Sequence, residues 1–466
     1  MPKLFAAPSK LAIPVWFVTK ETWPALRDKL PKRQSAFAVA SGFAPKAGTH
    51  CLLPDTDGSL AGVLFGLAGE EAAWRDALIA GRLVPVLPEG TYRFANEPPG
   101  GLPALELATL GWLLSTYRFT RYKPNSSKQP RLVAPDSLDA ARLEQMAEAQ
   151  FLARDLVNTP TNDMGPDALE AAALALAKQF KAKATVIRGD KLLDQNFPLI
   201  HAVGRAGAQA PRLVDFVWGP AKGPKVTLVG KGVCFDTGGL DIKPSSAMLL
   251  MKKDMAGAAT AMALARMIMA AELPVRLRVL LPIVENSIAG NAFRPGDIYP
   301  SRKGHTVEIG NTDAEGRLIL ADALALGDAE SPDLMFVFAT LTGAARVALG
   351  PDLPPFFTMD DGLAQEIAQH GTAVADPVWR LPLWEPYDSL IEGKISTINN
   401  VSNGPFAGSI TAALFLRRFI EKARAWAHFD IYGWNPSTKP GKPEGGDIQT
   451  ARLLFDLIEA RCGKAT

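Results

Sequence analysis

The sequence predicts an α/β protein with a mostly parallel or mixed central sheet, flanked by helices, in a C-terminal domain. It also predicts a smaller N-terminal α/β domain. From about residue 160 onward, strand-like apolar runs alternate with helical patterns, which is typical of a largely parallel sheet between helices. A length of 466 residues is enough for two or three domains. A composition of 47% apolar and 21% charged residues is that of a globular protein.

The N-terminal domain is expected to span residues 1–135. It contains strand-like runs at 11–18 and 62–67, separated by segments rich in proline and glycine. No dense group of acids, histidines or lysines occurs in it, so the sequence gives this domain no chemistry of its own. The stretch 123–130, with two prolines and four polar amides or hydroxyls, is predicted to be a linking loop.

The second domain is expected to span residues 136–466 and to begin with a helix. Asp136 or Ser137 could cap that helix, which carries an apolar stripe to about residue 157. The elements expected after residue 160 are strand 226–229, helix 257–273, strand 275–284, helix 317–326, strand 335–341, helix 409–425, strand 428–432 and helix 448–460. In such a sheet, ligands bind beyond the carboxyl ends of the strands.

Charge and cysteine content exclude several classes of protein. The formal net charge is only +2, so nothing indicates binding to nucleic acid or to an anionic membrane.

No apolar run approaches the roughly 20 residues that span a bilayer. Cys51, Cys234 and Cys462 lie far apart, which argues against disulfides and a thiolate zinc site and favours a cytoplasmic location.

Two polar segments, 229–255 and 311–317, stand out from this background. Asp313 and Glu315 are two residues apart beside a glycine, and carboxylates held that close repel each other unless a proton or cation lies between them. Asp236 and Asp254 bring the number of carboxylates to four, with no histidine in either segment. Oxygen ligands suit hard or borderline divalent cations, and four negative charges predict a two-metal site that activates water.

Basic residues are interspersed with these acids. Lys231 could bind a metal only as the neutral amine, whereas Lys243 and Arg317 could stay charged and face an anion in a transition state. The glycines around Lys231 also suggest a phosphate loop, but the full motif of such a loop is absent. Lys252 and Lys253 are expected to be a solvated pair, with only Asp254 directed at a metal.

Both segments resemble the signatures of the leucine aminopeptidase (cytosol aminopeptidase) family. Residues 311–318, with the sequence NTDAEGRL, match the hallmark octapeptide of that family. The resemblance extends through 154–160, 339–343 and 426–430 and so covers the chain from about residue 150 to the C-terminus. The first ~135 residues fit the family only by position and length.

The resemblance implies a role for each residue of the site. It implies two divalent metal ions per subunit, zinc or manganese or alternatively magnesium, and catalytic roles for Lys243 and Arg317. Lys243 would stabilise the gem-diolate, and Arg317 would anchor a bicarbonate that acts as general base. The implied metal ligands are Lys231, Asp236, Asp254, Asp313 and Glu315. The implied substrate-binding residues are Met251, Thr340, Leu341 and Gly343.

By the same resemblance, the protein is expected to be a metal-dependent aminopeptidase with a leucine-like preference. It would release N-terminal residues from short peptides that have a free N-terminus, using water activated by both metals. Family members are typically homo-hexamers with internal sites. Some members also act as DNA-binding architectural proteins, which is the alternative function for this chain, although its near-neutral charge weighs against nucleic acid as a partner.

Overall fold

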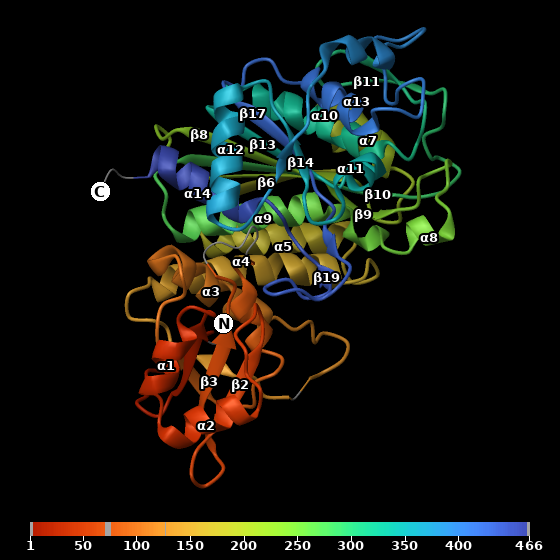
Figure 1. Ribbon diagram of the computed structural model, residues 1–466. Helices are drawn as coiled ribbons and strands as arrows, with labels where there is room; N and C mark the ends of the chain where they lie inside the picture. Colours follow the sequence, from red (N-terminus) through yellow and green to blue (C-terminus); the bar gives the residue numbers. More distant parts are fainter. Residues whose placement is uncertain (1–2, 70–75, 126, 464–466) are drawn as a thin grey trace. The chain divides into compact units, whose positions relative to one another are not determined.

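The computed structural model, shown in Figure 1, describes residues 3–69, 76–125 and 127–463. The chain forms two compact units. Unit 1 comprises Met1–Phe151 with Ser437–Glu444, and unit 2 comprises Leu152–Pro436 with Gly445–Thr466. The domain boundary expected between residues 135 and 136 stays a prediction.

Unit 1 is built on a five-stranded sheet in the order β2-β3-β1-β4-β5. Its strands are β1 (Ile13–Val18), β2 (His50–Pro54), β3 (Leu60–Gly66), β4 (Thr91–Phe94) and β5 (Arg131–Leu132). Only β2 runs antiparallel to its neighbour. The helices are α1 (Trp23–Lys29), α2 (Lys32–Ala40), the 3-10 helix η1 (Ile79–Leu83) and α3 (Gly101–Ser115). Val15, Phe65 and Trp112 are fully buried in its core.

Helix α4 (Ala140–Asn158) starts later than the sequence predicts. The side chain of Asp139 accepts a hydrogen bond from the backbone N–H of Arg142, as an N-cap residue does. Asp139, rather than Asp136 or Ser137, therefore marks the start of this helix.

Unit 2 contains a nine-stranded mixed sheet, as the sequence predicts. The path runs β15-β14-β17-β13-β8-β10-β7-β6, and β9 also pairs with β10. The strands are β6 (Lys183–Arg188), β7 (Arg212–Trp218), β8 (Lys225–Gly230), β9 (Gly232–Asp236), β10 (Arg276–Asn286), β13 (Leu334–Ala339), β14 (Pro355–Phe357), β15 (Trp379–Arg380) and β17 (Trp426–Asp430). The central strands β10, β8, β13 and β17 are mutually parallel, whereas β6, β7 and β14 add antiparallel pairings.

Helices cover both faces of this sheet (Figure 1). Helices α7 (Pro198–Gly204), α10 (Glu315–Asp328) and α13 (Gly408–Arg417) pack on one face, and α5 (Pro166–Gln179), α9 (Ala256–Ala270) and α14 (Ala451–Cys462) pack on the other. Unit 2 also contains the helices α6 (Lys191–Asp194), α8 (Ser245–Met248), η2 (Met251–Met255), α11 (Gly343–Leu349), α12 (Asp361–Ala373) and η3 (Glu385–Ile391). Small strands are β11 (Ile298–Pro300), β12 (Thr306–Glu308), β16 (Ile398–Asn399), β18 (Trp434–Asn435) and β19 (Gly445–Gly446).

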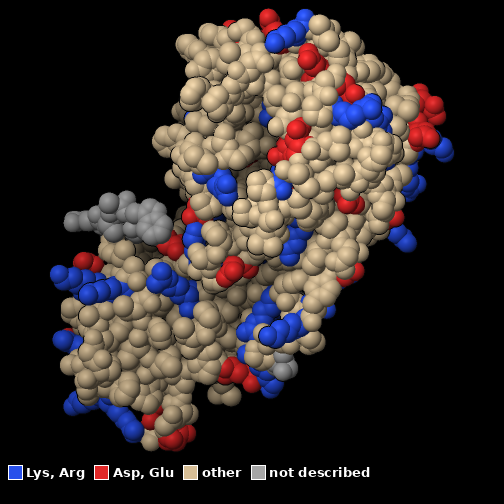
Figure 2. All heavy atoms as spheres, turned by 90° about the vertical axis from the view of Figure 1, so that its right-hand side faces the viewer, with Lys and Arg blue, Asp and Glu red and all other residues tan. Residues whose placement is uncertain are grey.

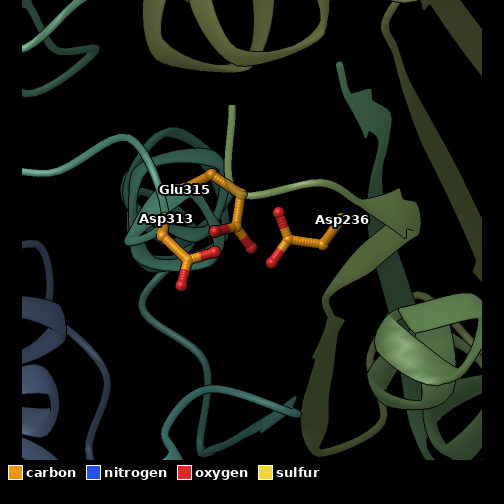
Figure 3. Close-up of side chains that lie close together, drawn as sticks. All are labelled: Asp236, Asp313 and Glu315. Carbon is orange, nitrogen blue, oxygen red and sulfur yellow. The ribbon is translucent and has the colours of Figure 1, made fainter. Parts of the chain in front are cut away.

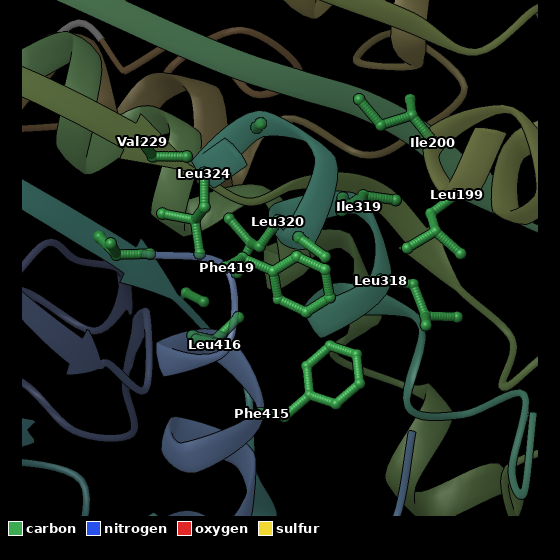
Figure 4. Close-up of a cluster of buried hydrophobic side chains, with 14 of the residues drawn as sticks. Leu199, Ile200, Val229, Leu318, Ile319, Leu320, Leu324, Phe415, Leu416 and Phe419 are labelled. Atoms are coloured by element: carbon green, nitrogen blue, oxygen red, sulfur yellow. The ribbon is translucent and has the colours of Figure 1, made fainter. Parts of the chain in front are cut away.

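The core between the sheet and α10 fixes the helix whose first residues belong to the site. Leu320 and Leu324, one turn apart on α10, are completely buried with Phe415 and Phe419 (Figure 4). Full burial of each such side chain contributes about 1.5–3 kcal/mol. Substantial apolar packing thus holds α10 in place.

Helix α13 is shorter than predicted, because it ends at Arg417 rather than near residue 425. The carboxylate of Asp328 accepts the backbone N–H groups of Lys422 and Ala423, both at 2.8 Å. These bonds draw the chain away from the helix and toward β17. The apolar pattern of the sequence does not indicate that Asp328 is the partner of this segment. The other elements expected in the sheet region are present, with shifted ends.

Within the described ranges, no helix has the length and apolar character needed to cross a membrane. Cys234 is buried, and the three cysteines are free thiols.

Candidate active site

The candidate site lies at the carboxyl edge of the central sheet of unit 2. Lys231 follows β8, Asp236 ends β9, Asn286 ends β10, Thr340 follows β13 and Asp430 ends β17. Parallel strands finish on the same edge of a sheet, so residues far apart in sequence meet there.

A cavity of about 470 Å³ opens at this edge. It is lined by all the residues singled out from the sequence. They are Lys231, Asp236, Lys243, Met251, Asp254, Asp313, Glu315, Arg317, Thr340, Leu341 and Gly343. The two polar segments therefore converge on one place, while the role of each residue stays a prediction.

Three carboxylates form the centre of the cluster. Asp236, Asp313 and Glu315 point toward one another (Figure 3), and each offers an oxygen within 4.8 Å of the others. Asp236 ends a strand, Asp313 lies in a loop, and Glu315 is the first residue of α10. Like charges this close require compensating positive charge.

Lys231 compensates the inner part of the cluster. Its Nζ lies 2.8 Å from Asp254 Oδ2 and 2.9 Å from Glu315 Oε1, and it donates to the backbone oxygen of Thr340 at 2.9 Å. Although burial opposes its charge, the carboxylates of Asp254 and Glu315 raise the pKa of Lys231.

Lys243 compensates the outer part. Its Nζ lies 2.8 Å from Asp236 Oδ2 and 2.5 Å from Asp313 Oδ1. Burial again opposes the charge, and the nearby carboxylates of Asp236 and Glu315 raise the pKa of Lys243.

The acids themselves are difficult to ionise. Burial, followed by the charge of Asp236, raises the pKa of Asp313 to about 6 and that of Glu315 to about 8. Burial is also the main reason why the pKa of Asp254 is raised. Within the described chain, Asp254 Oδ2, Asp313 Oδ1 and Glu315 Oε1 make no hydrogen bond of regular geometry, and their polar contacts are the ion pairs with Lys231 and Lys243. Such a donor set suits a bound cation.

Two glycines allow the segments to approach this closely. A Cβ at Gly316 would lie 2.6 Å from Lys231 Cε, so only glycine lets that lysine pass α10. Gly238 has φ +88°, and a Cβ there would lie 2.4 Å from the backbone oxygen of Asp241.

Residues that sequence reasoning missed hold the two segments in register. Asn286 donates to Asp236 Oδ1 at 2.8 Å and to the backbone oxygen of Thr312 at 3.1 Å. Thr312 Oγ1 in turn donates to the backbone oxygen of Gly238 at 2.6 Å. Asn286 ends a predicted strand, which could have pointed to it; Thr312 lies within the motif itself.

Asn400 organises the loop that carries Asp313. Its side-chain oxygen accepts from the backbone N–H of Gly310 at 2.7 Å, and its amide donates to the backbone oxygen of Asn311 at 2.7 Å. Its own backbone oxygen accepts from Arg317 Nη1 at 2.7 Å. No local pattern around Asn400 indicates this role.

Arg317 is buried near the acids but is not paired with them. Its Nε finds no hydrogen-bond partner among the residues that the structure describes. Burial lowers the pKa of the guanidinium to about 10, so it stays charged at neutral pH. A buried, partly unpaired guanidinium is suited to hold a planar anion.

The loop after β13 is fixed by the last residue of β17. Asp430 accepts the backbone N–H groups of Leu341 at 2.9 Å and Thr342 at 3.1 Å, and Thr342 Oγ1 donates to it at 2.6 Å. Thr340 Oγ1 bonds to Asp254 Oδ1 at 2.6 Å. The loop that carries Thr340 and Leu341 is thereby tied to the acidic cluster.

The prediction of a solvated Lys252–Lys253 pair is wrong. Lys253 is 6% exposed and donates to the backbone oxygen of Tyr432 at 2.6 Å, while Lys252 Nζ donates to the backbone oxygen of Asn158 at 2.7 Å. Burial lowers the pKa of Lys253 to about 8. Lys253 and Tyr432 line the cavity with Arg346 of α11.

Comparison with protein families identifies both parts of the chain. Residues 151–455 match the catalytic domain of the cytosol aminopeptidase family, and residues 13–135 match the N-terminal domain of M17 aminopeptidases. A probable cytosol aminopeptidase of Syntrophotalea carbinolica is 40% identical over 385 residues, or 78% of this chain and 77% of that protein. One of Aromatoleum aromaticum is 36% identical over 474 residues, or 94% and 92%.

Solved structures agree with these matches. The cytosol aminopeptidase from Coxiella burnetii superposes with a TM-score of 0.93 at 44% identity, covering 98% of each chain. The bottromycin maturation enzyme BotP in complex with Mn superposes with a TM-score of 0.87 at 31% identity, covering 97% of this chain and 99% of that one. The resemblance and the two-part α/β architecture predicted from the sequence are confirmed.

Proposed function

The chain belongs to the cytosol aminopeptidase family, whose members are peptidases and therefore hydrolases, and on that premise we propose that it removes N-terminal residues from short peptides with the help of two divalent metal ions. The observation that carries the proposal is the convergence of Asp236, Asp313 and Glu315 within 4.8 Å. The proposed first residue of the substrate has a leucine-like side chain.

The proposed ligands of the metals are Lys231, Asp236, Asp254, Asp313 and Glu315. Their chemistry fits, because Asp236, Asp313 and Glu315 offer carboxylate oxygens within 4.8 Å of one another. Asp254 and Glu315 meet at Lys231, and a lysine can contribute its neutral amine. The manganese of BotP supports manganese as one candidate; zinc and magnesium are the others. When bound, such ions polarise a carbonyl and lower the pKa of water.

The protein's own residues would then do the following. Lys243 lies at the cavity side of the cluster, where its ammonium can stabilise negative charge that develops on the carbonyl oxygen of the substrate. Arg317, with its unpaired Nε, can hold a bicarbonate that accepts a proton. The backbone oxygen of Leu341, on the loop tied down by Asp430, can position the substrate. Met251, Thr340 and Gly343 would form the wall of the side-chain pocket.

The test is hydrolysis of leucine p-nitroanilide by the metal-loaded protein, with N-acetyl-leucine p-nitroanilide as the matched control. Because the free amine is expected to bind at the acidic cluster, the unblocked compound should turn over and the acetylated one should not. Equal rates on both compounds, or no turnover of either, would contradict the proposal.

A cytoplasmic location and a homo-hexamer complete the proposal. The names of the relatives support the former. Light scattering would test the latter, with six copies of a 49.9-kDa chain as the expected particle. We do not propose the DNA-binding alternative. The net charge is +2, and Figure 2 shows acidic and basic side chains interspersed over the visible face of unit 2.

A further inference from the structure

The cavity has a basic wall as well as an acidic cluster. Lys253 Nζ lies 4.4 Å from the centroid of the Tyr432 ring, and the guanidinium carbon of Arg346 lies 5.5 Å from the same centroid. All three residues line the cavity that contains the four acids. The two cations therefore share one aromatic ring, which favours their charge but does not neutralise it.

Neither cation of this wall has a carboxylate partner in the described part of the chain. Lys253 donates only to a backbone oxygen, and among the described residues the ion pairs of unit 2 leave out Lys253 and Arg346. Other arginines of unit 2, such as Arg278 and Arg418, are paired with acids. Two unpaired cations beside one cavity are the arrangement expected where a ligand supplies the anion.

The wall adjoins the proposed side-chain pocket. Gly433 follows Tyr432 with φ +71°, and a Cβ at this position would lie 3.1 Å from Thr340 Cγ2. Thr340 donates a hydrogen bond to Asp254. Asp254 lies in η2 and directly follows Lys253 in the sequence. The basic wall thus lies beside the pocket residue Thr340, next to the acidic cluster and not in a separate hollow.

We propose that Arg346 and Lys253 bind a carboxylate of the substrate and so determine which peptides this enzyme prefers. This inference rests on the proposed aminopeptidase function. The carboxylate could be the side chain of an N-terminal aspartate or glutamate, or the C-terminus of a dipeptide. In either case the amine of the peptide lies at the acidic cluster and its carboxylate at the basic wall, so the two charges of the substrate match the two oppositely charged parts of the cavity.

Arg346 is the better residue to test. It is exposed on α11, so its replacement should leave the core intact, whereas Lys253 is buried. A partly solvated guanidinium–carboxylate pair is expected to change selectivity by about tenfold, which is about 1.4 kcal/mol. The effect should fall with ionic strength because salt screens exposed charges.

The experiment compares kcat/KM for four substrates. Glutamate p-nitroanilide has a side-chain carboxylate where leucine p-nitroanilide has two methyl groups, and Leu-Gly has a C-terminal carboxylate where Leu-Gly amide has a neutral amide. The proteins are the metal-loaded wild type, Arg346→Met, Arg346→Lys and Arg424→Met. Arg424 is 78% exposed and paired with Asp333, so it controls for the loss of a surface arginine.

We expect Arg346→Met to lower one of the two selectivity ratios by about tenfold. A fall in the Glu/Leu ratio identifies the side chain as the source of the carboxylate, and a fall in the acid/amide ratio identifies the C-terminus. Arg346→Lys should retain most of the affected ratio, and Arg424→Met should change neither. In the wild type, added salt should reduce the same ratio, which provides a check without any substitution.

The inference is overturned if leucine p-nitroanilide is hydrolysed but both ratios are the same in wild type and Arg346→Met. Absence of turnover on all four substrates by the wild type would overturn the proposed function and this inference with it. The two failures are therefore distinguishable.

Discussion

The two lysines of the site make the same kind of contact in different surroundings. Lys231 lies between Asp254 and Glu315, and these three side chains are 2–4% exposed. Lys243 lies between Asp236 and Asp313, but Lys243 is 14% exposed and Asp313 is 32% exposed. The inner group is thus part of the core, whereas the outer group opens to the cavity. We therefore expect the inner group to contribute mainly to the stability of the site, and the outer group to contribute mainly to substrate turnover.

Replacing each lysine by methionine should separate the two groups most strongly. In Lys231→Met, the buried side chains of Asp254 and Glu315 lose the ammonium that lies 2.8 and 2.9 Å from them, which is expected to lower the free energy of unfolding of the metal-free protein by about 3 kcal/mol. In Lys243→Met, solvent reaches the group, and the loss should be about 1 kcal/mol. Chemical denaturation monitored by circular dichroism measures both. Lys394→Met, at an exposed position, is the control, and equal losses in the two lysine variants would remove the distinction.

Asp313→Ala should test the outer group by activity. Loss of one proposed metal ligand is expected to lower kcat on leucine p-nitroanilide by at least about 10²-fold. Because Asp313 is partly exposed, the fold should persist, with a circular dichroism spectrum like that of the wild type. Asp361→Ala, which removes an exposed carboxylate of a surface ion pair, is the matched control. A kcat for Asp313→Ala close to that of the control would exclude Asp313 from the chemistry.

The pH dependence of metal binding should report the protonation of Glu315, which belongs to the inner group. The pKa of Glu315 is raised to about 8 and that of Asp313 to about 6, so in the metal-free protein Glu315 is protonated at pH 7. A carboxyl group must lose its proton to bind a metal. Affinity for Mn²⁺ should therefore rise by at least about tenfold per pH unit up to about pH 8, and less steeply above it, where the amine of Lys231 still has to lose its proton to bind.

Titration calorimetry of the metal-free protein in buffers of different ionisation enthalpy gives the number of protons released. Release of at least one proton per chain at pH 7 is the expected result. The same raised pKa values mean that, without metal, the contribution of these two acids to stability falls as pH rises from their unfolded values near 4 to their folded values. Metal affinity that does not change between pH 6 and pH 8 would contradict this account.

Asp430→Asn should have the smallest effect, because it touches neither lysine group. The side chain keeps its shape but loses the charge that binds the backbone N–H groups of Leu341 and Thr342. A loosened substrate loop is expected to raise KM by about threefold to tenfold, with metal content unchanged. A loss of metal instead would mean that Asp430 supports the inner group.

The sequence reveals the site better than it reveals the residues that build it. Lys231, Asp236, Asp313 and Glu315 lie in two short motifs at strand ends, and strand ends of a parallel sheet meet by topology. The family resemblance then implies a chemical role for each motif position. The sequence does not indicate Asn400, because this residue belongs to no regular pattern and acts through backbone groups of the motif loop.

The incorrect predictions for the end of helix α13 and for Lys253 have a similar cause. Helix α13 ends early because the carboxylate of Asp328, 94 residues away from Lys422, captures its N–H. Lys253 was expected in solvent because two adjacent lysines usually are, but the 3-10 helix η2 turns it inward against Tyr432. Both depend on contacts between distant parts of the chain, which periodicity and local composition do not record.

The central claim is that divalent ions held by the acids of both lysine groups are required for peptide hydrolysis. The direct measurement is turnover of leucine p-nitroanilide by one protein preparation before chelation, after chelation and after addition of Mn²⁺, with metal content determined at each stage. The account predicts about two ions per chain in the active protein, no turnover after stripping and recovery on addition of metal. Full turnover by the stripped protein would contradict it.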